Sequence, residues 1–203
     1  MGLLQDLKTK VLTADGAIGT LLYSYGLDYC HEEMNVARPE IIEKIHGEYI
    51  AAGADIIQTN TYGANAIKLA RYGYEGRVQE FNEAALKIAK RAAAGGQYVL
   101  ATIGGIRGIR KSDATLEEIL VAFKEQAEVL LAGEPDGFLL ETYYDFEELA
   151  QSVQLLRTLT DLPIIAQVTM QEAGVLQNGM SLNEALHDLQ RLGADIVGSN
   201  CRL

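Results

Sequence analysis

Two segments far apart in the chain share one pattern, in which Gly-Ala-Asp leads into a short apolar run that ends on polar residues. They are Gly53-Ala54-Asp55-Ile56-Ile57-Gln58-Thr59-Asn60 and Gly193-Ala194-Asp195-Ile196-Val197-Gly198-Ser199-Asn200. A weaker copy runs from Gly133 through Asp136 to Glu141 and Thr142. The glycine can end a helix with a positive φ angle, and the apolar run can then enter a sheet. Repeated junctions of this kind indicate β/α units and therefore a parallel sheet.

Six apolar runs are candidate strands, and amphipathic stretches separate them. The runs are Val11–Ala14, Asp55–Thr59, Tyr98–Ile103, Gly137–Leu140, Ile164–Thr169 and Asp195–Ser199. They are continuous rather than alternating, which is typical of strands covered on both faces. Helices are predicted to begin at Pro39, Val78, Thr115, Asp145 and Ser181, with capping-box patterns at Thr115 and Ser181.

An open doubly wound sheet and a closed barrel both fit six such units. A dinucleotide-binding sheet would place Gly-x-Gly-x-x-Gly after its first strand, but here Asp15-Gly16-Ala17-Ile18-Gly19-Thr20 follows. Polar residues end most of the strands, at Asp15, Asn60, Glu141, Thr169 and Cys201. In a TIM barrel these strand ends build the active site. We therefore predict an α/β fold, a (β/α)8 TIM barrel of which about six units are present.

Residues 1–203 are predicted to form a single, partial barrel domain. Eight β/α units typically need about 250 residues. The expectation is therefore that roughly two further units follow Leu203, the last residue of this sequence.

Composition excludes several classes of partner. Acidic residues outnumber basic ones by 28 to 17, and the net charge of −11 disfavours binding to a nucleic-acid backbone. No apolar run approaches the roughly 18 residues of a membrane span, and Met1–Leu7 does not resemble a secretory signal. Two cysteines are too few for a disulfide scaffold. The expectation is a cytoplasmic protein without nucleic-acid or membrane partners, whose open strand edges are prone to oligomerise.

Two polar segments have both a structural and a functional interpretation. Asp15-Gly16-Ala17 is either a turn after a strand or a carboxylate at the barrel mouth, where Gly16 lets a ligand approach the backbone. The run from Gln58 to Asn65 is either a solvated loop or a source of hydroxyl, amide and N–H groups suited to a carboxylate ligand.

Three further sites carry the same ambiguity. Glu141 follows three apolar residues, so it needs a cationic partner, either a substrate ammonium or a neighbouring Lys or Arg, or has a raised pKa. The loop Gly104–Gly108 is either a phosphate cradle or a plain connection. Cys201 is either a small core residue or a zinc ligand. No complete metal site can be assembled from the other candidates, which are Cys30, His31, His46 and His187.

Five blocks, taken in order, resemble the homocysteine-binding barrel of the homocysteine S-methyltransferases. They are Asp15–Thr20, Asn35–Glu40, Tyr49–Asn65, Leu140–Asp145 and Gly198–Cys201. The resemblance spans nearly the whole chain. Within the family it is closest to bacterial forms fused to a 5,10-methylenetetrahydrofolate reductase domain, which implies FAD and a folate in a domain outside this sequence.

The resemblance also assigns roles to particular residues. Three cysteines hold zinc in this family, and Cys201 matches the first of them, whereas the second and third, a Cys-Cys pair, have no counterpart here. The carboxylates of Asp15 and Glu141 would hold the ammonium group of homocysteine. Its carboxylate would meet backbone N–H groups of Gly16, Ala17 and Thr59, and the side chains of Asn60 and Asn200 would support the site.

The implied function is zinc-dependent methyl transfer to the thiol of homocysteine, which gives methionine. The methyl donor stays open among S-methylmethionine, S-adenosylmethionine, betaine, a methylfolate and methylcobalamin. Because two zinc-ligand cysteines are absent from the sequence, the 203-residue chain alone is expected to be inactive. The alternatives are a TIM-barrel lyase or aldolase that binds a phosphorylated substrate at Gly104–Gly108, and a non-catalytic fragment.

Overall fold

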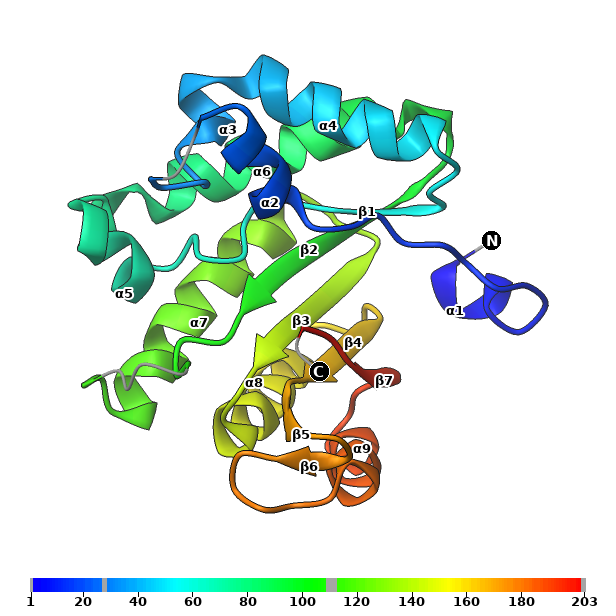
Figure 1. The fold of residues 1–203 in the computed structure, drawn as a ribbon, viewed down its shortest axis with the longest axis vertical. Coiled ribbons are helices and arrows are strands. Elements are labelled where there is room, and N and C mark those ends of the chain that lie inside the picture. Colours follow the sequence, from blue (N-terminus) through cyan, green and yellow to red (C-terminus); the bar gives the residue numbers. More distant parts are fainter. Residues whose placement is uncertain (1, 27–28, 109–112, 202–203) are drawn as a thin grey trace.

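The fold is built on a single parallel sheet of five strands (Figure 1). A computed structural model describes residues 2–26, 29–108 and 113–201, so Met1 and Leu203, the ends of the predicted domain, lie outside it. The strands are β1 (Ile56–Gln58), β2 (Tyr98–Gly104), β3 (Gly137–Tyr143), β4 (Ile164–Val168) and β7 (Ile196–Ser199). Their spatial order, β1-β2-β3-β4-β7, follows the chain, and every neighbouring pair is parallel. A doubly wound sheet reverses its order partway, so the barrel-type prediction is confirmed.

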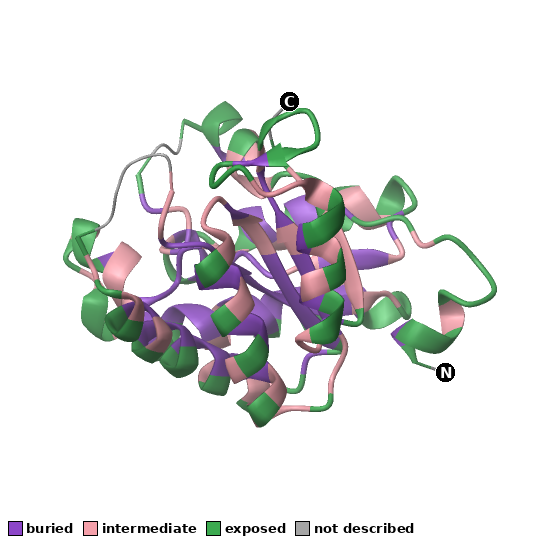
Figure 2. Ribbon diagram, turned by 90° about the horizontal axis from the view of Figure 1, so that it is seen from below, coloured by how far each residue is buried: buried purple, intermediate pink, exposed green. Residues whose placement is uncertain are grey.

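Five long helices follow the predicted starts and pack against the sheet. They are α4 (Pro39–Ala51), α6 (Val78–Ala92), α7 (Leu116–Ala132), α8 (Phe146–Leu159) and α9 (Leu182–Arg191). Thr115 and Ser181 form the predicted capping boxes, and the Asp145 side chain caps α8. Buried helix residues face the strands while exposed ones face outward (Figure 2). No helix in the described ranges is both long and apolar enough to span a membrane.

Several short elements lie in the connections and were not predicted, because none is long enough to show a hydrophobic period. The helices are α1 (Leu3–Asp6), α2 (Ile18–Ser24), α3 (Met34–Ala37) and α5 (Ala66–Leu69), with 3-10 turns η1 (Ala70–Tyr72), η2 (Glu75–Arg77) and η3 (Ala93–Gly95). A hairpin of β5 (Met170–Glu172) and β6 (Val175–Leu176) follows β4.

The predicted first strand, Val11–Ala14, is wrong in its extent. Only Ala14 forms a β-bridge, to Ile56, and Val11 is 91% exposed. The segment still runs parallel to β1, because the Asp55 N–H donates to the Thr13 carbonyl at 2.8 Å. The Asp15 N–H in turn donates to the Ile56 carbonyl at 2.9 Å. These two bonds bring Asp15 alongside the end of β1.

The face of the sheet opposite the long helices changes from apolar to polar along the strands. Its lower layer is an apolar cluster of Leu3, Ile56, Leu100, Leu139 and Ile165. Side chains two residues further along a strand point to the same face. One such step toward the strand ends gives Gln58, Thr102, Glu141 and Gln167. The apolar layer therefore forms a floor, and the polar layer above it faces the loops at the carboxyl ends of the strands.

Candidate functional site

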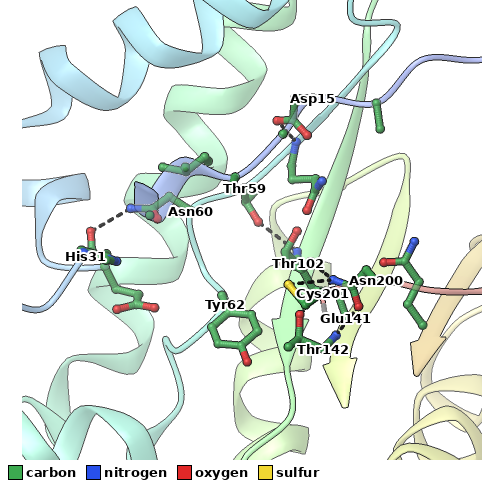
Figure 3. A pocket seen from close by; sticks show the side chains of 18 residues that line it. Asp15, His31, Thr59, Asn60, Tyr62, Thr102, Glu141, Thr142, Asn200 and Cys201 are labelled. Carbon is green, nitrogen blue, oxygen red and sulfur yellow. Dashed lines mark hydrogen bonds between the residues drawn. The ribbon is translucent and has the colours of Figure 1, made fainter. Parts of the chain in front are cut away.

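A cavity of about 550 Å³ opens above this polar layer, at the carboxyl ends of the strands (Figure 3). All eight residues that the sequence nominated line it: Asp15, Gly16, Ala17, Thr59, Asn60, Glu141, Asn200 and Cys201. They come from the segment after Ala14 and from the ends of β1, β3 and β7. Parallel strands in sequential order bring these distant segments to one edge, which is why the sequence blocks converge.

Asp15 is buried, with 9% of its surface exposed, and only one of its two carboxylate oxygens is satisfied. Oδ2 accepts a hydrogen bond from the Gln58 N–H at 2.9 Å. Oδ1 is buried and has no partner among the described residues. Burial raises the pKa of Asp15 to about 7, and the negative charge of Glu141 adds to this rise. A cation beside Oδ1 would satisfy the oxygen and reverse the shift.

The raised pKa of Asp15 predicts a specific pH dependence of stability in the absence of ligand. Its ordinary value is 3.8, so between about pH 4 and pH 7 the folded state holds a proton that the unfolded state has released. The free energy of unfolding should therefore fall as pH rises through this window, by at most about 1.4 kcal/mol per pH unit, and level off above it. Urea unfolding of the wild type and Asp15→Asn at several pH values measures the difference. Identical pH profiles for the two proteins would show that Asp15 is not a buried acid.

Glu141 projects from β3 into the cavity and is held by Asn200. The Asn200 Nδ2 donates to Glu141 Oε2 at 2.8 Å and to Thr142 Oγ1 at 2.9 Å. The same side chain accepts the Thr142 N–H through Oδ1 at 2.9 Å. Burial raises the pKa of Glu141, while the charge of Lys68 and the bond from Asn200 oppose the rise. Asn200 therefore fixes the direction of this carboxylate, as the predicted supporting role requires.

Cys201 lies at the mouth of the cavity, on the same side as Glu141 (Figure 3). The residue is exposed and has a φ angle of 48°, a left-handed conformation that non-glycine residues rarely adopt. Its Sγ is 3.9 Å from Asn200 Nδ2, the nitrogen that also binds Glu141. The Asn200 amide therefore contacts both the Cys201 thiol and the Glu141 carboxylate. Because Cys201 is exposed, the alternative that it is a small core residue is wrong.

Thr59 and Asn60 line the cavity, but the role predicted for the Thr59 backbone is wrong. The Thr59 N–H donates to the Leu100 carbonyl at 3.0 Å, so it is already engaged in the sheet. Asn60 fits the predicted supporting role, because its Nδ2 donates to the His31 carbonyl at 2.8 Å and to Asn35 Oδ1 at 2.9 Å. These bonds tie the loop after β1 to the segment that precedes α4.

Gly16 and Ala17 form the rim next to Asp15. A Cβ on Gly16 would lie 2.9 Å from Tyr49 Oη, so the glycine permits close packing against α4. The Tyr49 hydroxyl donates to the Ala17 carbonyl at 3.3 Å. Within the described ranges the N–H groups of Gly16 and Ala17 have no hydrogen-bond partner. Two backbone donors therefore remain for a ligand, where the prediction counted three.

Several lining residues were not nominated from the sequence. Thr102 and Gln167 lie two residues past buried members of the apolar floor, so the strand period could have found them. Glu32 comes from the loop before α3, while Tyr62 belongs to the run from Gln58 to Asn65, which the sequence singled out only as a whole. Glu32 Oε1 accepts the Gly63 N–H at 2.6 Å, and Oε2 accepts the Cys30 thiol at 3.6 Å. No local pattern marks the contact between Glu32 and Gly63, because it joins segments that are distant in the chain.

The loop Gly104–Gly108 does not form a phosphate cradle. A buried carboxylate, that of Glu148 on α8, already accepts the N–H groups of Ile106 at 2.6 Å and Arg107 at 2.8 Å. The Gly104 N–H donates to the Tyr62 carbonyl. The Arg107 guanidinium is 3.2 Å from Asp145. The lyase or aldolase alternative, which depended on phosphate at this loop, therefore has no support.

The metal ligands implied by the sequence are only partly present. Across residues 2–26, 29–108 and 113–201, no group of three His, Cys, Asp or Glu side chains is arranged to hold a metal. Cys30 is buried under the loop after β1, and burial lowers the pKa of His46 to about 4. Cys201 is thus one candidate ligand, and the described residues do not complete a zinc site around it.

The sequence is similar to those of two mycobacterial methionine synthases. The chain is 32% identical to methionine synthase of Mycobacterium tuberculosis (strain ATCC 25618 / H37Rv) and 31% identical to that of Mycobacterium leprae (strain TN). Each alignment covers 98% of this chain but only 18% of the relative, so the chain spans under a fifth of their length.

The fold is similar to that of the homocysteine methyltransferase MmuM from Escherichia coli in its metallated form. The TM-score is 0.84 at 22% identity, over 97% of this chain and 77% of that one. The apo form of the same protein gives a TM-score of 0.77. Residues 12–203 match the family described as homocysteine S-methyltransferase. Because that match covers nearly the whole sequence, and the relatives and the fold agree with it, this chain belongs to the homocysteine S-methyltransferase family.

Proposed function

We propose that this chain binds homocysteine in the cavity and presents its sulfur for methylation, which gives methionine. One observation carries the proposal. Asp15 Oδ1 is a buried carboxylate oxygen without a partner, in a cavity shared with Glu141 and Cys201. Burying such a group is costly unless a cation pairs with it. The ammonium group of an amino acid is a cation of suitable size.

The geometry supports one orientation of homocysteine. Its ammonium group lies between the carboxylates of Asp15 and Glu141, where the negative charge of Glu141 adds to the raised pKa of Asp15. Its carboxylate meets the free N–H groups of Gly16 and Ala17. Its thiol then extends toward Cys201, on the Glu141 side of the cavity. The chain's own contribution is therefore to bind and orient the substrate.

Zinc is the group that would activate the homocysteine thiol, and Cys201 is the one candidate thiolate ligand for it among the described residues that line the cavity. A thiol is a poor nucleophile until it loses its proton, and zinc coordination supplies that deprotonation. Cys201 would provide one thiolate ligand. The other two cysteines implied by the family resemblance are not in this sequence.

The 203-residue chain alone should bind zinc weakly and form no detectable methionine, because a single thiol does not make a tetrahedral site. Competition with a metallochromic dye measures the affinity. Cys201→Ser should abolish the weak binding, while Cys30→Ser, at a buried thiol, should leave it unchanged. Tight stoichiometric zinc binding that survives Cys201→Ser, or robust methionine formation, would contradict this prediction.

Homocysteine recognition is tested by comparing ligands that differ in one group. L-Homocysteine should bind to the chain in a calorimetric titration, whereas 4-mercaptobutanoate, which lacks the ammonium group, should bind at least about 30-fold more weakly. The reason is that only the amino acid satisfies Asp15 Oδ1. Equal affinity for the two ligands would refute the role of the carboxylates.

A fused methylenetetrahydrofolate reductase domain with FAD and a folate, and a cytoplasmic location, stay predictions from the sequence.

A further inference from the structure

Lys68 is a half-buried cation just outside the cavity, and it has no ion pair among the described residues. Its Nζ lies 3.8 Å from the centre of the Tyr62 ring and 3.5 Å from the Gly104 carbonyl oxygen. Its backbone is fixed, because its N–H donates to the capping side chain of Asn65 at 3.0 Å. Burial lowers the pKa of Lys68 to about 8, although the charges of Glu32 and Glu148 oppose this. Partial burial of an ammonium group without an ion pair is unfavourable, so the position of Lys68 suggests a functional role.

The group that Lys68 contacts is a wall of the cavity. The Tyr62 ring faces the hollow shared with Glu141 and Cys201 (Figure 3). On β2, Gly104 allows the ring to lie against the strand, because a Cβ there would be 2.1 Å from the ring. The Gly104 N–H also donates to the Tyr62 carbonyl at 3.0 Å. The Tyr62 ring therefore has two packing partners, Gly104 on β2 and the ammonium group of Lys68.

We propose that Lys68 is a positioning residue for homocysteine, which acts by holding the Tyr62 ring in place as a wall of the substrate cavity. The proposal rests on the proposed function. It assigns to Tyr62 a part in selecting the length of the amino-acid side chain, because a displaced ring widens the space next to Cys201. A cation over an aromatic ring is the interaction that a neutral side chain of the same length cannot make.

The experiment is a double-mutant cycle on Lys68→Met and Tyr62→Leu, read out as affinity for L-homocysteine and for L-cysteine. Lys68→Met alone should weaken homocysteine binding by about three- to thirtyfold, the range expected for loss of a cation–π contact, and should narrow the preference for homocysteine over cysteine. The double variant should be no weaker than Tyr62→Leu alone, because Lys68 acts through the ring. Lys68→Arg should restore both readouts, and Lys87→Met, on the exposed face of α6, is the matched control.

A second measurement reads the ring itself without ligand. With 13C-labelled tyrosine, the Tyr62 ring signals, identified by their loss in Tyr62→Leu, should shift in Lys68→Met but not in Lys87→Met. If Lys68→Met fails to fold, Lys68→Gln replaces it in both measurements.

Unchanged ring signals, unchanged selectivity in Lys68→Met, or additive effects in the cycle would each overturn the proposal. If the wild type binds no homocysteine although the ring signals shift as expected, the proposed function fails, and with it the role of Lys68 in substrate binding. That outcome differs from a failed Lys68–Tyr62 contact, in which homocysteine binds but the ring does not respond.

Discussion

Replacing Glu141 with glutamine should weaken L-homocysteine binding by at least about 30-fold. Removing one partner of a buried, hydrogen-bonded charge pair costs about 2 kcal/mol or more, which corresponds to that factor. Glutamine keeps an oxygen that can accept the Asn200 Nδ2–H, so the fold around Asn200 is preserved and only the charge is lost. Isothermal titration of the two proteins with L-homocysteine measures the change.

The matched control is Glu172→Gln, at an exposed carboxylate on the β5–β6 hairpin, which should bind like the wild type. Asp15→Asn should weaken binding comparably to Glu141→Gln, because both carboxylates are proposed to hold the same ammonium group. Wild-type affinity in both carboxamide variants would exclude the ammonium site.

Replacing Glu148 with alanine should lower the free energy of unfolding by about 3 kcal/mol. The Glu148 carboxylate is 1% exposed and accepts the N–H groups of Ile106 and Arg107. The substitution leaves two backbone donors without partners and opens a space beneath the loop. For a chain of this size the loss corresponds to a fall in Tm of about 6–12 °C.

The neighbouring residue offers a matched control for this prediction. Glu147 lies in the first turn of the same helix, and its side chain is 69% exposed. Glu147→Ala should therefore change the Tm by no more than about 2 °C, since exposed ion pairs contribute little. Equal losses in the two variants would mean that the loop is not anchored by Glu148.

The fold was predictable because its signals are local. Capping residues such as Thr115 and Ser181 mark helix starts within a few positions, and continuous apolar runs mark covered strands. The prediction of a first strand over Val11–Ala14 was wrong for a physical reason. The segment pairs with β1 through one bridge, and Val11 is exposed to solvent. A hydrophobic run predicts extended structure, but a strand also needs neighbours.

The candidate site was predictable to the extent that it lies at strand ends. Asp15, Glu141 and Cys201 each follow an apolar run, and sequential parallel strands bring such positions together. The engaged Thr59 N–H was missed because its acceptor, the Leu100 carbonyl, belongs to another strand.

The contact between Lys68 and Tyr62 was missed for a related reason. The two residues are close in the chain, but Gly104, which lets the ring approach the strand, comes from β2. A sequence pattern shows which groups are present, whereas the pairing of groups across segments depends on the assembled sheet.

The most direct test is a crystal structure of this chain with L-homocysteine bound. The amino group should lie within hydrogen-bond distance of both Asp15 Oδ1 and the Glu141 carboxylate, with the sulfur directed toward Cys201 Sγ. An amino group bound elsewhere, or a sulfur that points away from Cys201, would contradict the assignment of this cavity as the homocysteine site.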